Sequence, residues 1–191
     1  MLADVLLALS ALVLMFVTIG LELYFIYAIV ISKNCKYPPA FPSFGNMKRL
    51  SLAEARKVLA ESGTPLRVVD LGCGTGTMLL PLAREFPEHF FAGYDWDRFV
   101  TAIIRFRSRK MKNVEIIRDD FMKADIASYD LLLCFLDTKA AEDLSTEMKE
   151  KLKSGAVVIS NAFELKGMVP EKILDAKSYG MPLKVYVYKN K

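Results

Sequence analysis

The sequence of 191 residues predicts an α/β fold, in which helices cover a mainly parallel sheet, preceded by one membrane-spanning helix. Three observations support this fold. Short apolar runs alternate with helical patterns from Leu66 onward, a glycine-rich stretch follows the first of these runs, and residues 5–31 are almost wholly apolar. The roughly 160 residues after the apolar segment suffice for one domain with a single core and a cleft. This division argues against a wholly soluble protein, a multi-span transporter and a disordered chain.

The apolar segment predicts a membrane anchor over residues 1–32. Residues 5–31 contain one charge, Glu22, and at about 1.5 Å per residue would form about 40 Å of helix, more than a hydrocarbon core of about 30 Å. A cleaved signal peptide would begin with cations, whereas this chain begins with the acid Asp4. A span over residues 2–21 would leave Glu22 at the interface, beside an aromatic belt of Tyr24, Phe25 and Tyr27. Alternatively, Glu22 faces a partner helix within the membrane.

The charge distribution predicts the orientation of this anchor. All 26 Lys and Arg follow residue 32, so the positive-inside rule places the domain in the cytoplasm, or on the matrix side in an organelle of bacterial descent. The three cysteines have no motif spacing, and His89 is the single histidine. A disulfide scaffold and a Cys/His metal site are therefore not expected.

Residues 33–50 contain three prolines and no helical period, which predicts a stiff extended linker ahead of a domain over residues 51–191. Ser51 and Glu54 have the spacing of a capping box, so we expect a helix to begin at Ser51. Its apolar stripe would consist of Leu52, Ala55, Val58 and Leu59.

The rest of the domain predicts a seven-strand sheet. Strand-like runs cover residues 66–71, 90–94, 114–118, 130–136, 156–160, 171–177 and 183–189, and helical patterns cover residues 77–86, 99–110 and 140–152. Regular alternation implies right-handed crossovers and parallel strands. Only five residues join the last two strands, too few for a crossover helix, so these strands should form an antiparallel hairpin.

The most informative stretch is VVDLGCGTG, from Val68 to Gly76. Glycines between a strand and a helix permit unusual dihedrals and close approach of the backbone to a ligand. The spacing G-x-G-x-G differs from the dinucleotide fingerprint, and Asp70 stands two residues ahead of the first glycine. A carboxylate there would repel a pyrophosphate but suits a cationic ligand.

Acids and aromatics after the next two strands extend this candidate site. Asp95 ends the second strand, where an acid can bind both ribose hydroxyls. Trp96 could pack on an adenine face or be an ordinary half-buried aromatic. Asp120 and Phe121 follow the third strand and could read an adenine edge, whereas we expect Asp97 and Asp119 to be solvated surface acids.

The segments VVDLGCGTG, GYDWD and RDDF, in this order, resemble the class I S-adenosylmethionine-dependent methyltransferases. That resemblance implies a Rossmann-like seven-strand sheet with an antiparallel last strand and S-adenosyl-L-methionine as the cofactor. It also implies that Asp95 binds the ribose, Trp96 the adenine ring, and Asp120 with Phe121 the adenine amino edge. The methionine part would face the first loop: Asp70, Leu71, Gly72, Cys73, Gly74 and Gly76.

A narrower resemblance covers nearly the whole chain. The apolar helix, the lead YPPAFP, the GYD strand, the stretch KLKSGAVVISNAF and the terminal VYVY are similar to small membrane-anchored protein-lysine methyltransferases. That family modifies the adenine nucleotide translocase and the ATP synthase c subunit, and it has prokaryotic relatives. This chain departs from the family pattern at Thr75 and Asp95, where the family usually has an acid and a Glu, and in residues 134–139.

If the methyl acceptor is a lysine, its ammonium must lose a proton, which desolvation among aromatics and an orienting carboxylate promote. Asp137, just beyond the fourth strand, is our candidate for that carboxylate, although it could simply cap the following helix. Phe135 is the first candidate for the aromatic wall, and the others are Tyr37, Phe41 and Phe163. For each aromatic, plain core packing is the alternative.

Nucleic acid is not the favoured substrate, because Cys134 to Asp137 match neither the adenine nor the cytosine methylation patterns after strand four. The basic helix with Arg98, Arg105, Arg107, Arg109 and Lys110 could follow phosphates, face solvent or attract anionic lipid headgroups. The sequence thus predicts a membrane-anchored methyltransferase acting on a lysine of a membrane-associated protein. Two alternatives stay open: methylation of a lipid-like or quinone-type molecule, and a catalytically silent cofactor-binding adaptor.

Overall fold

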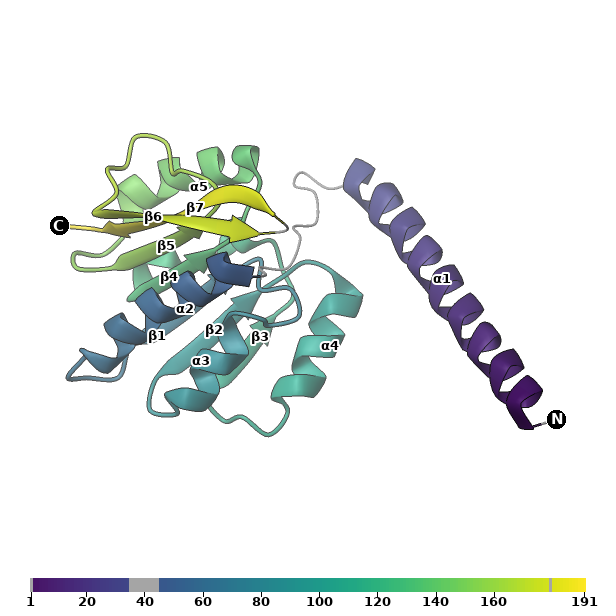
Figure 1. Ribbon diagram of the computed structural model, residues 1–191. Helices are drawn as coiled ribbons and strands as arrows, with labels where there is room; N and C mark the ends of the chain where they lie inside the picture. The colour runs from purple at the N-terminus through teal and green to yellow at the C-terminus, as the bar shows by residue number, and fades with distance from the viewer. Residues whose placement is uncertain (1, 35–44, 179) are drawn as a thin grey trace. The chain divides into compact units, whose positions relative to one another are not determined.

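The computed structural model describes residues 2–34, 45–178 and 180–191, in two compact parts that we treat separately. The first part contains one helix, α1 (Leu2–Asn34), drawn in purple in Figure 1. The second contains the sheet and the remaining helices. The predicted linker prolines, Tyr37 and Phe41 lie outside the described residues.

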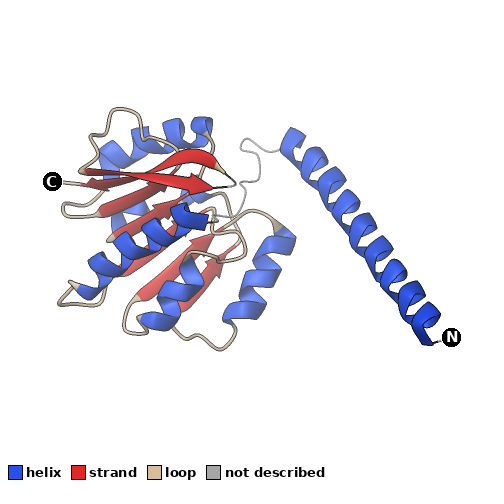
Figure 2. Ribbon diagram, in the orientation of Figure 1, coloured by secondary structure: helices blue, strands red, loops and turns tan. Residues whose placement is uncertain are grey.

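The domain has seven described strands, which confirms the predicted count and the predicted α/β class (Figure 2). The strands are β1 (Arg67–Leu71), β2 (Phe90–Tyr94), β3 (Val114–Ile117), β4 (Leu131–Cys134), β5 (Val157–Asn161), β6 (Lys172–Ser178) and β7 (Met181–Lys189). The helices are α2 (Gly45–Ala60), α3 (Leu79–Glu85), α4 (Arg98–Ser108) and α5 (Thr138–Lys151), with short 3-10 turns at Phe121–Lys123 and Ile126–Ser128. Every predicted strand and helix of the domain is present, with ends shifted by a few residues.

The strand order is β3-β2-β1-β4-β5-β7-β6. Strands β1 to β5 pair in parallel, and β7 is antiparallel to both β5 and β6, which confirms the predicted hairpin. Right-handed crossovers from β1 outward to β3 place α3 and α4 on one face, and the crossover from β4 to β5 places α5 on the other (Figure 1). The direction of winding therefore reverses between β1 and β4, where open α/β sheets bind ligands at the carboxyl ends of their strands.

Helix α2 begins six residues earlier than predicted. Ser51 is not its N-cap but a buried residue in its second turn, and its hydroxyl donates to the Met47 carbonyl oxygen at 2.9 Å. The expected linker therefore ends before residue 45. The predicted apolar stripe is confirmed, since Leu52, Ala55 and Leu59 are buried and Val58 packs against the same core.

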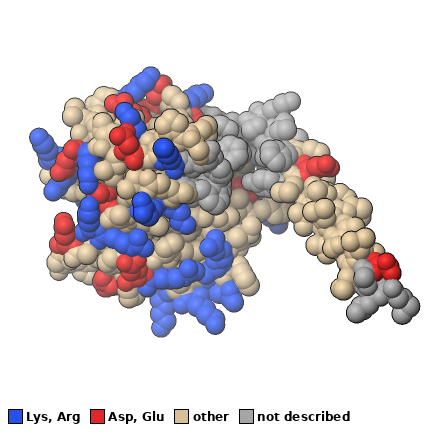
Figure 3. Space-filling view, in the orientation of Figure 1, with Lys and Arg blue, Asp and Glu red and all other residues tan. Residues whose placement is uncertain are grey.

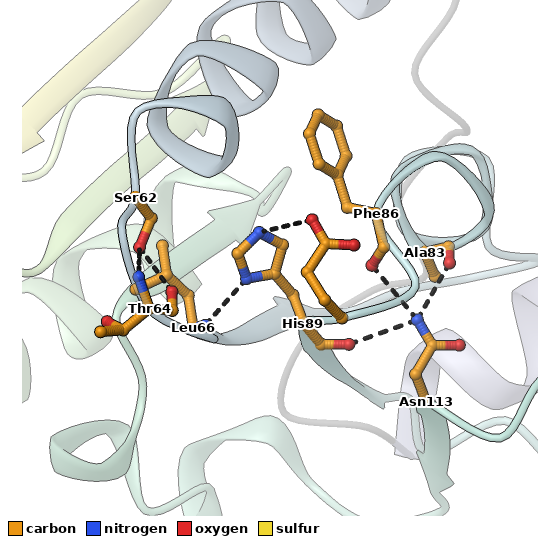
Figure 4. Close-up of polar contacts among 8 residues, drawn as sticks. Ser62, Thr64, Leu66, Ala83, Phe86, His89 and Asn113 are labelled. Carbon is orange, nitrogen blue, oxygen red and sulfur yellow. Dashed lines mark hydrogen bonds and ion pairs between the residues drawn. The ribbon is translucent and has the colours of Figure 1, made fainter.

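Polar contacts fasten the amino ends of the strands (Figure 4). His89 Nδ1 accepts a hydrogen bond from the Leu66 amide at 2.8 Å, joining the segment before β1 to the segment before β2. Asn113, just ahead of β3, donates to the Ala83 carbonyl oxygen at 2.9 Å. These contacts make His89 a structural residue and leave the opposite, carboxyl ends of the strands for a binding site.

Candidate functional site

The loop after β1 has the backbone that the glycine spacing predicts. Gly72, Gly74 and Gly76 have φ angles of 81°, 52° and 79°, in the left-handed region that side chains disfavour. The amides of Gly72 and Cys73 both donate to the Tyr94 carbonyl oxygen, at 2.9 and 2.8 Å, so the loop is tied to the end of β2. The loop lies at the carboxyl edge of the sheet, beside the reversal point between β1 and β4.

Close packing requires glycine at two positions. A Cβ atom on Gly76 would lie 2.7 Å from side-chain atoms of both Ile104 and Leu80. A Cβ atom on Gly93, in β2, would lie 2.8 Å from Cys73 Sγ. The loop therefore packs directly onto α4 and β2, which fixes its course.

Asp70 lies at the base of this loop and is buried, with 5% of its surface exposed. Burial, followed by the charge of Asp95, raises the pKa of Asp70 to about 7. No hydrogen bond or ion pair reaches its carboxylate from the residues that the structure describes. A buried carboxylate in this state favours a cation, which would restore its ordinary ionisation.

Asp95 is held by the backbone around it. Its two carboxylate oxygens accept hydrogen bonds from the Gly74 and Asp97 amides, each at 2.9 Å. Burial raises the pKa of Asp95, and these two hydrogen bonds oppose that effect. Each oxygen retains a second lone pair, so the fixed carboxylate can still accept from a pair of ribose hydroxyls.

Of the two acids near Asp95 that were predicted to be solvated, only one lies at the surface. Asp97 was expected to be solvated, but it is buried and caps α4, accepting from the Phe99 amide at 2.7 Å and the Val100 amide at 3.0 Å. That expectation was wrong because Asp97 lies directly ahead of the helix predicted over residues 99–110 and serves as its N-cap. Asp119 does lie at the surface, 2.7 Å from Lys123.

The predicted adenine residues lie after β2 and β3, which are adjacent in the sheet. Trp96 is half-buried, directly after Asp95. Asp120 caps the 3-10 turn and accepts from the Met122 amide at 2.9 Å, and Phe121 is buried. The structure therefore gathers the predicted cofactor residues at the carboxyl ends of β1, β2 and β3.

On the other side of the reversal point, β4 ends at the predicted catalytic residues. The Phe135 ring stacks on Phe163, which follows β5, with centroids 6.4 Å apart. Asp137 caps α5, and its Oδ1 accepts from the Lys139 amide at 2.8 Å and the Ala140 amide at 3.1 Å. The cap fixes the side chain, and no described residue donates to Oδ2.

The sequence pattern did not single out a buried polar pair at the end of β5. The Ser51 hydroxyl of α2 also lies in hydrogen-bond contact with the side-chain amide of Asn161, and both residues are buried. Ala162, the next residue, has a φ of 68°, and its amide donates to the Lys184 carbonyl oxygen at 2.8 Å. A polar residue ending an apolar strand was the available signal, but its partner lies 110 positions away in the sequence.

The fold and this site fit a cofactor with a cationic amino acid part and a nucleoside part. Asp70 can complement the cation, the glycine loop can approach it closely, and Asp95 can hold the ribose. A seven-strand sheet of order β3-β2-β1-β4-β5-β7-β6 with such a loop defines the class I S-adenosylmethionine-dependent methyltransferases. The chain is an enzyme of this class.

Comparison with known proteins identifies the family. Residues 70–172, more than half of the chain, match the ANTKMT methyltransferase domain, and the chain belongs to that family. A protein-lysine N-methyltransferase of Saccharolobus islandicus is 27% identical over 124 residues, which cover 63% of this chain and 77% of that protein.

Solved structures share the fold at low sequence identity. An RNA methyltransferase from Salinibacter ruber, in complex with S-adenosyl-L-homocysteine, superposes with a TM-score of 0.66 at 20% identity. That match covers 78% of this chain and 93% of the other. TYW2 from M. jannaschii, in complex with AdoMet, has a TM-score of 0.56 at 18% identity and covers 74% and 77% of the two chains.

Proposed function

We propose that this enzyme methylates a lysine side chain of a membrane-associated protein, and that α1 anchors it in that membrane. The lysine acceptor rests on one observation, the protein-lysine N-methyltransferase of Saccharolobus islandicus, which aligns over 77% of its own length. The membrane part rests on α1.

In the proposed mechanism, S-adenosylmethionine supplies an electrophilic methyl group on a sulfonium. Asp70 would balance the charge of the cofactor's amino acid part, and Asp95 would orient its ribose. In the loop of Gly72, Gly74 and Gly76, the absence of side chains would let the backbone lie close to the cofactor. A cofactor held by these residues would have its methyl group at a fixed position, so catalysis would depend mainly on aligning the acceptor with it.

The acceptor lysine would lie on the β4 side of the site, where its ammonium releases a proton to water. The neutral amine would then form a bond to the methyl carbon as the sulfur–carbon bond breaks, and S-adenosyl-L-homocysteine would leave. Phe135 and Phe163 form an apolar wall that excludes water and lowers the pKa of the incoming ammonium. Asp137, fixed by its two amide hydrogen bonds through Oδ1, offers Oδ2 to orient the amine. In this role its capping of α5 and its contact with substrate use different oxygens.

Helix α1 has the length and composition of a membrane span. It comprises 33 residues, and the most apolar window, Asp4–Leu23, has a mean hydropathy of 2.4 and no residue buried. Twenty helical residues extend about 30 Å, the thickness of a hydrocarbon core. Glu22 lies next to the end of this window, which favours its placement at the interface. The excess of Lys and Arg after residue 32 supports a single-pass topology with the domain on the cytoplasmic or matrix side.

Native membranes incubated with the enzyme and radiolabelled S-adenosylmethionine test the proposal directly. Label that remains with protein, and that acid hydrolysis recovers as methyl-lysine, supports it. Label extracted with lipid would instead identify a lipid-like or quinone-type acceptor. An absence of label, together with intact cofactor binding by calorimetry, would indicate a silent adaptor. Asp95→Asn serves as the control, because it should abolish incorporation by weakening cofactor binding.

A further inference from the structure

Helix α4 carries an unusual outward face. Its buried side, Thr101, Ile104 and Ser108, packs toward the sheet. On the opposite side, Phe99, Ile103 and Phe106 are 62%, 48% and 65% exposed. Their spacing of four and three residues places them on one face, one above the other. We call these three residues the α4 ridge.

The ridge is not typical of the rest of the domain. Within residues 45–178 and 180–191, six large apolar side chains are strongly exposed, and three of them form the α4 ridge. The other three, Val169, Ile173 and Met181, lie in or near the β6–β7 hairpin, at the opposite end of the strand order. Clustered exposed apolar side chains mark a surface that another molecule covers.

Cations flank the ridge along α4 and the turn that follows it. Residues 98–113 contain six Lys and Arg and no Asp or Glu. Arg105 and Arg107 donate to the carbonyl oxygens of Ile116 and Thr75. Arg109 donates to the carbonyl oxygen of Phe106. Backbone carbonyls position these guanidinium groups but leave their charge in place. Among the described residues, none of the six cations forms an ion pair.

The positive surface continues past the end of α4. A hollow of about 540 Å³ lies there, and its lining includes Arg84, Lys110 and Lys112. Figure 3 shows Lys and Arg gathered over the lower ends of α3 and α4. An apolar ridge bordered by cations is the pattern of helices that lie in the headgroup region of a bilayer containing anionic lipids.

We propose that the α4 ridge and its flanking cations bind the surface of an anionic membrane. Phe99, Ile103 and Phe106 enter the boundary between headgroups and acyl chains, and the guanidinium groups bind lipid phosphates. A nucleic acid would account for the cations, but the aliphatic Ile103 at the ridge has no ring for a base to stack on. The bilayer accounts for both the charges and the apolar face.

This contact would orient the active site. The first turn of α4 is joined to the predicted ribose ligand, because Asp97 accepts from the Phe99 amide and donates its own amide to Asp95. A domain resting on α4 therefore holds the cofactor site close to the bilayer surface, where lysines next to a membrane segment lie. The proposal concerns the domain surface and does not require α1 to span the membrane.

A fluorescent reporter on full-length protein tests the contact. The exposed Ala102 is replaced by Cys and labelled with an environment-sensitive dye in a Cys35→Ser background, since Cys73 and Cys134 are buried. We expect a blue shift with vesicles of equal parts phosphatidylcholine and phosphatidylserine, and little change with phosphatidylcholine alone. An identical spectrum on both vesicles would overturn the proposal.

Substitutions separate the ridge from the charges. Phe99→Ser with Phe106→Ser should weaken the response to anionic vesicles at least tenfold. Arg98→Gln with Arg109→Gln should weaken it about fivefold per charge. Ile103→Ser should lower it, whereas the matched control Ile173→Ser, with 49% exposure, should not. Calorimetry with S-adenosylmethionine shows that each variant is folded.

Two further measurements distinguish the α4 contact from membrane insertion of α1. Sedimentation with neutral vesicles reports insertion of α1 alone. Protein that sediments with both vesicles but gives the same reporter spectrum would refute the α4 contact and leave the anchor intact. A blue shift that depends on the ridge, in protein that fails to bind neutral vesicles, would support the contact without the anchor. A larger response to an RNA oligonucleotide than to anionic vesicles would overturn the proposal in favour of nucleic acid.

Discussion

At the residue scale, Asp70 makes the stability of the protein depend on pH. Its pKa in the folded state is about 7, compared with an ordinary value of 3.8, because burial and the nearby Asp95 disfavour its charge. The folded state thus binds one more proton between these values, so its contribution to stability is fully present below pH 3.8 and is lost as pH rises through about 7.

We expect the Asp70→Asn variant to lack this dependence. The free energy of unfolding of the wild type, relative to the variant, should fall by about 1.4 kcal/mol per pH unit, or roughly 4 kcal/mol in all. Urea unfolding at a series of pH values without cofactor measures the difference. Parallel curves for the two proteins would show that Asp70 is ionised normally.

Binding of S-adenosylmethionine should show the reverse pH dependence. A cationic ligand favours the ionised form of Asp70, so its affinity should rise as pH increases through about 7, with release of a proton below that pH. Calorimetry in buffers of different ionisation enthalpy measures the protons released. The Asp70→Asn variant should bind more weakly and release none at this site.

The glycines of the loop should differ in their tolerance of alanine. Gly76→Ala combines a positive φ with a Cβ contact of 2.7 Å to both Ile104 and Leu80, and should cost about 2 to 4 kcal/mol of stability. Gly74→Ala, with a φ of 52° and nothing within 4 Å of its Cβ atom, should cost about 1 kcal/mol. Thermal unfolding compares the two variants. Equal losses would contradict the packing of the loop against α4.

At the element scale, Asp137 begins α5 and is also our candidate for orienting the acceptor. Asp137→Asn retains a capping oxygen but removes the charge, whereas Asp137→Ala removes both. If the carboxylate orients the lysine, the asparagine variant should be as stable as wild type and methylate at least tenfold more slowly. The alanine variant should also lose about 1 kcal/mol of stability. Unfolding and single-turnover methylation separate the effects, and full activity of the asparagine variant would leave Asp137 a cap alone.

The elements themselves followed from local patterns, but some of their ends did not. Strands β1 and β4 were predictable because an apolar run between turn residues suffices for a buried parallel strand. The start of α2 was mispredicted because serine is a residue type that commonly caps helices, yet the Ser51 hydroxyl donates within the helix to the Met47 carbonyl oxygen and contacts Asn161. The burial of Asn161 as a polar partner of Ser51 depends on a contact between distant parts of the sequence, and no local pattern in the sequence contains that contact.

Asp97 and Asp137 illustrate the same difference between local and tertiary information. Both cap helices at the carboxyl edge of the sheet, and capping needs only the next three residues. Capping was predicted as an alternative for Asp137 but not for Asp97, although the helix predicted over residues 99–110 begins only two residues after Asp97. That the predicted cofactor residues lie together was predictable mainly because they follow strands β1, β2 and β3 directly, so that parallel pairing brings them to one edge.

At the scale of the whole molecule, the two ends of the sheet have different tasks. His89 and Asn113 fasten the segments that enter the strands, while the glycine loop, Asp95 and Phe135 lie where strands leave the sheet. Substitution at the first end should therefore alter stability more than chemistry. The reversal of winding between β1 and β4 separates the predicted cofactor residues from the predicted acceptor wall, so in the proposed mechanism the methyl donor and the acceptor would lie on opposite sides of this point.

The proposed anchor should raise the activity of the enzyme on substrates in the same membrane. A chain fixed in the bilayer meets membrane substrates at a high effective concentration, which a soluble enzyme does not. Replacing Leu14 and Val17 by Arg places two charges in the middle of α1 and should release the protein from membranes on alkaline extraction. Methylation of a substrate in vesicles should then fall at least tenfold, while methylation of a free lysine peptide stays the same. A parallel loss on both substrates would mean that the two arginines disturb the catalytic domain, and equal activity of both proteins on vesicles would show that α1 contributes nothing to substrate access.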